Sequence, residues 1–214
     1  MVSMMTNRPV NPNPPAFIAD RPDVLKAFHF ACHAHREQVR KYSGEPYIYH
    51  PIEVATILHE SFPDNPPPDE VLSAALLHDV VEDCGITFTE LRREFGEVVA
   101  SLVMQLTDLI TTAQGNRETR KVLEAERLRW SCPASQTIKI ADMISNTISI
   151  VANDKDFAVV YLSEKRRALQ NISLSWHVDR DHLPGEEAAK LLNRATEMVQ
   201  LARINLQQEG LTIQ

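Results

Sequence analysis

Apolar residues recur at helical spacing through most of this chain, and no run of four to eight residues alternates apolar and polar side chains as a strand does. Near the start, Val24, Leu25, Phe28, Ala31 and Cys32 follow the period of one helix face. Only 6 of the 214 residues are glycine, which also favours helices over a turn-rich β architecture. The pattern predicts an all-α protein without internal repeats or a second domain.

Proline, glycine and capping residues divide the sequence into segments. Asp20 with Pro22 is typical of a helix start, Thr87 and Glu90 form a capping-box pattern, and Gly96 separates the helix that follows from the next one. We expect helices over about residues 20–39, 52–60, 69–83, 87–95, 98–106, 117–130, 135–151, 163–176 and 186–208. They predict a single bundle of about eight to ten helices over residues 19–214. Residues 1–18, rich in proline and asparagine, are expected to form a flexible arm.

Composition excludes several classes of function. The net charge of −7 argues against nucleic-acid binding through a general basic surface, although a local cluster of Lys and Arg can still hold an anion. Three widely separated cysteines argue for a reducing compartment. No secretory signal and no apolar stretch of membrane-spanning length is visible, so we expect a cytoplasmic protein without membrane contact.

The segment AALLHDVVED, residues 74–83, places four polar side chains in an apolar helix. His78 and Glu82 are four residues apart, as are Asp79 and Asp83, so all four should project from one flank. Burial of a histidine and three carboxylates without partners is very costly, and a bound cation is one solution. A solvated helix end is the alternative for a lone His-Asp pair, but the apolar context argues against it.

Asp142 and His50 are two further polar residues in notable positions. Asp142 lies in the middle of the apolar segment TIKIADMISNTISI, with Asn146 four residues later on the same side. His50 precedes Pro51, which favours an extended backbone where the chain enters a helix. Each has an ordinary structural explanation when taken alone: a hydrogen-bonded aspartate, and a histidine packed at a loop–helix junction.

Two histidines and two aspartates from three segments can together supply four nitrogen and oxygen ligands to a first-row divalent ion: His50, His78, Asp79 and Asp142. Manganese or iron suits that mixture, and zinc is not excluded. Glu82 and Asp83 are then free to orient or deprotonate a water bound at the site. The sequence therefore predicts the metal centre of a phosphohydrolase.

The loop QVRKYSGEPYIYHP carries the opposite charge. Arg40 and Lys41 can bind phosphate, the arginine through paired hydrogen bonds and the lysine as a point charge. We expect Ser43, in the turn beside them, to contact the substrate as well. A tyrosine ring of the loop can stack on a nucleotide base. The alternative is a solvated pair of charges at a helix end. Most members of two further basic groups are expected on exposed helix faces: Arg117, Arg120 and Lys121, and Arg166 and Arg167.

Four segments resemble the HD-domain hydrolases of the RelA/SpoT type, especially the small stand-alone alarmone hydrolases. They are AxxAHRxQxRKYSGEPYIYHP (31–51), LLHDVVED (76–83), FTELRREFG (88–96) and KIADMISN (139–146). RKxSGEPYxxHP followed by LLHDVVED is specific to this branch. With the helical stretches between them, the resemblance covers about residues 20–172.

The resemblance implies an enzyme that hydrolyses guanosine tetra- and pentaphosphate at the 3′-diphosphate, giving GDP or GTP and pyrophosphate, usually with manganese. It implies the four metal ligands named above and assigns Glu82 and Asp83 to the attacking water. It implies nucleotide-binding roles for Arg40, Lys41 and Asn146, and phosphate-binding roles for Lys121 and Arg166.

One segment departs from the family pattern. Where family members often read KLADRLHN, this chain reads KIADMISN, so Met143 and Ser145 replace side chains that help to shape the pocket. The alternatives are the same chemistry on another nucleotide, such as a nucleoside monophosphate or the 2′-phosphate of NADPH, and a nucleotide-sensing helical module without turnover. The length leaves no room for the synthetase and regulatory domains of long family members, so we expect hydrolysis without synthesis. The native metal and the oligomeric state are left open.

Overall fold

The computed structural model describes residues 12–178 and 185–212, and no β-strand lies in these ranges. The α-helices are, in chain order, α1 (Ala16–Ala19), α2 (Pro22–Ala34), α3 (Tyr49–Ser61), α4 (Asp69–Leu77), α5 (Val80–Cys84), α6 (Phe88–Leu106), α7 (Arg117–Arg129), α8 (Pro133–Asn153), α9 (Lys155–Val178) and α10 (Glu186–Gln208). A short 3-10 helix, η1 (Thr112–Gln114), precedes α7. The prediction of an all-α helical bundle is confirmed.

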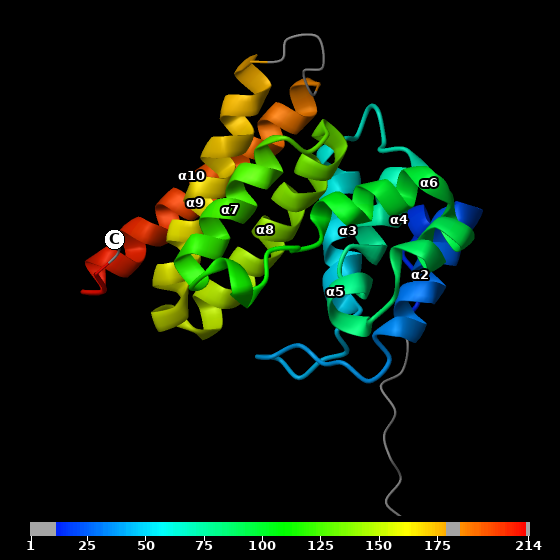
Figure 1. Cartoon of the computed structure of the whole chain (residues 1–214), viewed down its shortest axis with the longest axis horizontal. Coiled ribbons are helices and arrows are strands. Elements are labelled where there is room, and N and C mark those ends of the chain that lie inside the picture. The colour runs from blue at the N-terminus through cyan, green and yellow to red at the C-terminus, as the bar shows by residue number, and fades with distance from the viewer. Residues whose placement is uncertain (1–11, 179–184, 213–214) are drawn as a thin grey trace, which may run out of the picture.

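The helices form two groups that meet along α8 (Figure 1). In one group, α4 packs against α2, α3 and α6; in the other, α9 packs against α7, α8 and α10. Helix α8 also contacts α3, α4 and α6 of the first group. Its apolar side chains Ile138, Ile140, Ala141 and Ile144 are buried in the core. Helix α8 therefore carries Asp142 into the boundary between the two groups.

Two local signals near α6 have the predicted effect. Thr87 Oγ1 accepts a hydrogen bond from the Glu90 backbone nitrogen, and the Glu90 carboxylate accepts one from the Thr87 backbone nitrogen at 2.9 Å. This reciprocal capping box begins the helix. Gly96, with φ 83° and ψ 174°, then breaks the helical path, so α6 is two helical segments joined at a kink.

The first long helix is shorter than predicted. Helix α2 ends at Ala34, whereas the apolar period favoured an end near Val39. The backbone nitrogen of Tyr47 donates to the Gln38 carbonyl at 2.9 Å, and that of Arg40 donates to the Glu45 carbonyl at 2.8 Å. Residues 38–47 thus fold back on themselves as a loop, which a continuing helix would prevent (Figure 1).

The prediction of one continuous helix over residues 69–83 is wrong, because the structure has two helices there. Helix α4 ends at Leu77, and α5 begins at Val80, so His78 and Asp79 lie at the junction between them. In a continuous helix the Ala75 carbonyl would accept from the backbone nitrogen of residue 79. Here it accepts a hydrogen bond from the His78 ring at 2.7 Å. The two metal-ligand candidates therefore lie where the helical hydrogen-bond pattern is interrupted.

The extended backbone expected at His50 is also wrong. Helix α3 begins at Tyr49, so His50 and Pro51 both lie in its first turn. A proline is tolerated there because the first backbone nitrogens of a helix have no partner within it. His50 therefore has a helical backbone, and its ring direction is set by α3 rather than by a loop.

The predicted arm is only partly described. Residues 1–11 lie outside the described ranges, whereas residues 16–18, which we placed in the arm, belong to α1, and Ile18 is fully buried. At the other end, α9 begins at Lys155 rather than at Ser163, and α10 has its predicted bounds. Among the described helices, none combines the length and apolar character needed to cross a membrane.

Candidate metal centre and substrate pocket

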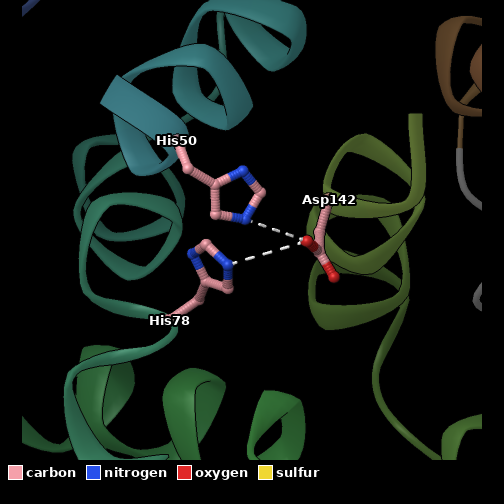
Figure 2. A group of neighbouring side chains, drawn as sticks. All are labelled: His50, His78 and Asp142. Atoms are coloured by element: carbon pink, nitrogen blue, oxygen red, sulfur yellow. Dashed lines mark ion pairs between the residues drawn. The ribbon is translucent and has the colours of Figure 1, made fainter. Parts of the chain in front are cut away.

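His50, His78 and Asp142 meet at the boundary between the two helix groups (Figure 2). One ligand atom from each lies within 4.8 Å of the others. His50 Nε2 lies 3.2 Å from Asp142 Oδ1, and His78 Nε2 lies 3.8 Å from the same oxygen. Figure 2 shows the two rings entering from one side and Asp142 facing them from α8. All three side chains are buried.

Asp79, the fourth predicted ligand, lies beside this group. Its Oδ2 atom is 3.0 Å from His78 Nε2 and 3.7 Å from His50 Nε2. The same oxygen accepts a hydrogen bond from the Tyr47 hydroxyl at 2.7 Å. The structure thus brings all four predicted ligands together from α3, the α4–α5 junction and α8.

The partners of the two rings indicate how each imidazole is oriented. His78 Nδ1 must donate to the Ala75 carbonyl, because a carbonyl only accepts. This leaves Nε2 facing the carboxylates, and when the ring is neutral, as a metal ligand must be, Nε2 offers its lone pair there. His78 Nε2 is buried, and no described residue makes a well-formed hydrogen bond to it. A cation at the shared centre would use this lone pair, so the residues present fit a divalent metal.

The charges of the cluster favour a cation as well. Burial lowers the pKa of His78, but the Asp79 and Asp142 carboxylates outweigh it and raise the value to about 9. Burial raises the pKa of Asp142, but Lys139, 3.1 Å from Oδ2, and the two histidines hold it well below its ordinary value. The carboxylates therefore stay ionised and require positive charge between them.

The two candidate catalytic acids lie on α5, at the edge of this centre. Both are exposed, which contradicts the expected burial of all four polar residues of the HDVVED segment. Glu82 Oε2 accepts a hydrogen bond from the Asp108 backbone nitrogen at 3.3 Å, and Asp83 Oδ2 accepts one from Gln38 Nε2 at 2.9 Å. The break after α4 explains the difference, because α5 turns its acidic side toward solvent.

The basic loop divides into an inner and an outer part. The Arg40 guanidinium is 16% exposed, and its Nη2 atom lies 4.0 Å from Glu53 Oε2 on α3. Lys41 and Ser43 are exposed, and Lys41 Nζ pairs with Asp154 at 3.1 Å beyond the end of α8. The structure therefore links Arg40, but not Lys41 or Ser43, to residues beside the metal cluster.

Tyr47 has a different role from the base stacking considered for the loop tyrosines. Its ring packs against the His35 ring, with centroids 4.8 Å apart, and against the His50 ring at 5.7 Å. Its hydroxyl is the group that donates to Asp79. Tyr47 is thus a neighbour of the metal ligands, and Tyr49, 42% exposed, is the tyrosine with an accessible ring.

The remaining predicted substrate residues lie on the α8 and α9 side. Asn146 Nδ2 donates to Asp142 Oδ1 at 2.5 Å. Lys121 and Arg166 both line a cavity of about 510 Å³ between α7 and α9. Lys121 also lines a smaller adjoining cavity with Lys139 and Lys165. The smaller cavity thus brings together lysines from α7, α8 and α9, and it is also lined by the acids Asp108, Glu124 and Glu164.

Sequence reasoning missed three residues at this site, Glu53, Lys139 and Lys165, and it named Ser145 only as a departure from the family segment. Helical spacing could have indicated two of them, because Glu53 follows His50 by three residues and Lys139 precedes Asp142 by three. No local signal indicated Lys165, or that Ser145 would contact His50. Ser145 hydrogen-bonds across to α3, and Lys165 reaches the cavity from α9.

Comparison with known proteins places this geometry in a family context. Residues 27–156 match the HD domain profile. The mouse guanosine-3′,5′-bis(diphosphate) 3′-pyrophosphohydrolase MESH1 is 42% identical over 125 residues, which cover 58% of this chain and 66% of the mouse protein, just under two thirds. A guanosine-3′,5′-bis(diphosphate) 3′-pyrophosphohydrolase of Aquifex aeolicus is 30% identical over 163 residues, 76% of this chain and 22% of that protein.

A solved structure extends the comparison to most of the chain. It is described as a metazoan ortholog of SpoT that hydrolyzes ppGpp and plays a role in starvation responses. The match has a TM-score of 0.65 at 26% identity and covers 94% of this chain and 99% of that chain.

Proposed function

The chain belongs to the HD domain family, and from this premise we propose that it hydrolyses the 3′-diphosphate of guanosine tetraphosphate and pentaphosphate, releasing pyrophosphate and GDP or GTP. The convergence of His50, His78 and Asp142 on one buried centre, with Asp79 beside them, carries the proposal. The names of the mouse and Aquifex aeolicus relatives support the choice of substrate.

We propose manganese as the cofactor, with another first-row divalent ion as the alternative, held by His50, His78, Asp79 and Asp142. Two imidazole nitrogens and two carboxylates are a suitable donor set for such an ion. When bound, the metal supplies a Lewis acid that polarises the phosphoryl group and neutralises developing charge. Lys139 holds Asp142 from the far oxygen, and the Tyr47 hydroxyl holds Asp79, so both carboxylates are oriented toward the centre.

Glu82 and Asp83 are the proposed groups that act on the attacking water. Although Glu82 as a residue is exposed, its carboxyl group is partly desolvated, and this, with Asp108 nearby, raises the pKa of Glu82 and makes it a better proton acceptor than an ordinary glutamate. In the proposed step, the water oxygen bonds to the phosphorus attached to ribose O3′, and the water proton passes to a carboxylate. The bond between that phosphorus and O3′ breaks, and O3′ takes up a proton.

The proposed substrate contacts come from the loop before α3, from α8 and from the cavity between α7 and α9. Arg40, Lys41 and Ser43 come from the loop before α3, and Asn146 comes from α8 beside Asp142. Lys121 and Arg166 line the cavity between α7 and α9, whose volume of about 510 Å³ suits a nucleotide-sized anion. In this proposal, cations from the loop and from the α7–α9 cavity hold the two diphosphate groups of one substrate. The cytoplasmic location expected from the sequence stays a prediction.

The test is incubation of the full chain, reconstituted with Mn²⁺, with guanosine tetraphosphate, followed by separation of the products. We expect GDP and pyrophosphate from the unmodified protein. The Asp79→Ala and Glu82→Ala variants should lose about 10²-fold or more in turnover, the size of effect seen when one key polar group of an active site is removed. Glu197→Ala, an exposed acid on α10, is the matched control and should be unaffected.

Product analysis separates this proposal from its alternatives. Orthophosphate released from NADPH or a nucleoside monophosphate, without pyrophosphate from guanosine tetraphosphate, would assign the same centre to another nucleotide. Absence of any turnover with guanosine tetraphosphate and Mn²⁺ would contradict the proposal. Full activity of the Asp79→Ala variant would contradict its assignment as a metal ligand.

A further inference from the structure

We propose that Ser145 and Glu53 are positioning residues that hold the imidazole of His50 in the orientation needed for metal binding. The inference rests on the metal-dependent function proposed above. Ser145 lies at one of the four positions where this chain departs from the family segment KLADRLHN, and it stands there in place of a histidine. It is buried on α8, three residues after Asp142, and faces the first turn of α3.

The hydrogen bonds link three side chains in series, and these side chains come from two helices. His50 Nδ1 lies 2.9 Å from Ser145 Oγ, and Ser145 Oγ donates to Glu53 Oε2 at 2.7 Å. Serine has one proton to donate, and a carboxylate only accepts. Because the Ser145 proton points to Glu53, the serine oxygen must accept from His50 Nδ1–H. Nε2, the other ring nitrogen, then faces Asp142 Oδ1 at 3.2 Å and is the atom left to bind a metal.

The orientation of the His50 ring depends on side chains, whereas that of the His78 ring depends on a backbone group. His78 Nδ1 is held by the Ala75 carbonyl, a backbone group three residues earlier, which no side-chain substitution removes. His50 Nδ1 is held by a side chain from a different helix. Loss of the Ser145 hydroxyl would leave the buried His50 N–H without an acceptor and free the ring to rotate or change tautomer.

Glu53 completes the arrangement because its carboxylate is itself held in place. Glu53 lies on α3, one turn after His50, and its Oε2 atom is 4.0 Å from Arg40 Nη2. The Arg40 guanidinium lies beside this carboxylate, and the carboxylate accepts the hydrogen bond that Ser145 donates. Substitution of a side chain that hydrogen-bonds to a metal-binding histidine typically lowers metal affinity 10- to 100-fold.

The test measures Mn²⁺ affinity directly, by calorimetric titration of the metal-free full chain, and does not depend on turnover. Ser145→Ala should raise the Kd for Mn²⁺ about 10- to 100-fold, and Glu53→Gln should raise it by a smaller factor. Ser145→Thr, which keeps the hydroxyl, should retain most of the affinity. The matched control is Ser135→Ala, the same substitution at a buried position near the start of α8, which should not change the Kd.

Each outcome decides the inference. An equal Kd for Ser145→Ala and Ser135→Ala, with unchanged helical circular dichroism, would overturn it. If Ser145→Ala does not fold, the Glu53→Gln variant decides. The Glu53 side chain is 43% exposed, so the replacement leaves no cavity. An unchanged Kd of Glu53→Gln for Mn²⁺ would then overturn the inference. Failure of the unmodified protein to bind Mn²⁺ or any other first-row ion would overturn the proposed metal-dependent function together with it. Tight binding by the parent and all variants alike would overturn only the roles of Ser145 and Glu53.

Discussion

At the scale of single residues, three lysines beside the metal centre differ in how their charges are used. Lys139 pairs with Asp142, and Lys121 pairs with Asp108. Lys165 lines the same small cavity, yet it forms no ion pair with any residue of the described ranges. Its ammonium group lies over the Tyr161 ring, 5.0 Å from the centroid. Lys165 is therefore the member of this trio whose charge no carboxylate of the described residues pairs with.

The charge of Lys165 should make substrate binding depend on pH. Burial, and then the nearby Lys139, lower the pKa of Lys165 to about 8. A lysine loses its positive charge as the pH rises through its pKa, so the cavity becomes less attractive to phosphate above about pH 8. We expect KM for guanosine tetraphosphate to rise about fivefold between pH 7 and pH 9, the equivalent of one charge interaction on the order of 1 kcal/mol.

The control for this prediction is the Lys165→Met variant. Its KM should be higher at pH 7 and should lack the rise that the unmodified protein shows. Steady-state kinetics at saturating Mn²⁺ measures both. A rise of the same size in Lys165→Met would assign the pH dependence to another group.

At the scale of the elements, breaks in helices decide where the site residues point. The junction between α4 and α5 places His78 and Asp79 at the metal centre while α5 carries Glu82 and Asp83 at its edge. A second break lies in α6, where Gly96 has φ 83° and ψ 174°. This backbone region is essentially restricted to glycine. The helix after the kink reaches the core through Val99, Val103 and neighbouring apolar residues.

Gly96→Ala should destabilise the fold by about 1–3 kcal/mol, because a Cβ at this φ and ψ strains the backbone. Beyond the adjoining backbone, no atom lies within 4 Å of the position a Cβ would take, so the cost comes from the backbone conformation and not from a clash with a packed neighbour. Urea unfolding followed by circular dichroism measures it. Gly185→Ala is the matched control, since Gly185 has φ −58° and equally open surroundings. Equal stability of the two variants would contradict the argument.

At the scale of the whole molecule, the metal centre joins parts that are distant in the sequence. Its candidate ligands come from α3, the α4–α5 junction and α8, so a bound ion ties the two helix groups together (Figure 2). Without an ion, the negative charges of Asp79 and Asp142 at this boundary are compensated by protonated His78 and by Lys139. Metal binding and folding are therefore expected to be coupled.

Mn²⁺ should raise the melting temperature of the full chain, and a chelator should reverse the effect. An ion that binds only the folded state stabilises it by about 2.7 kcal/mol at 100 times its Kd. Differential scanning calorimetry with and without Mn²⁺ measures the shift. The Asp142→Asn variant should show no such shift, because one ligand charge is lost. An equal shift in this variant would indicate that the ion binds elsewhere.

Much of this protein could be predicted because the deciding information is local. The apolar period predicted the helices, the Thr87 and Glu90 pattern predicted a real capping box, and Gly96 predicted a real break. The motifs around His50, His78 and Asp142 predicted which side chains would meet. The errors at the end of α2 and after α4 share one cause: hydrogen bonds from the loop backbone and from the His78 ring compete with helix continuation.

The sequence by itself determined the helical class, the family and the identity of the four candidate ligands, because periodicity, caps and contiguous motifs act over a few residues. Only the tertiary structure decided how those ligands are oriented and which partners hold them. Ser145 meets His50 across α8 and α3, and Lys165 reaches the pocket from α9. Such contacts depend on how helices that are far apart in the chain pack against each other. Because the boundary between the helix groups is buried, each polar group there needs a partner.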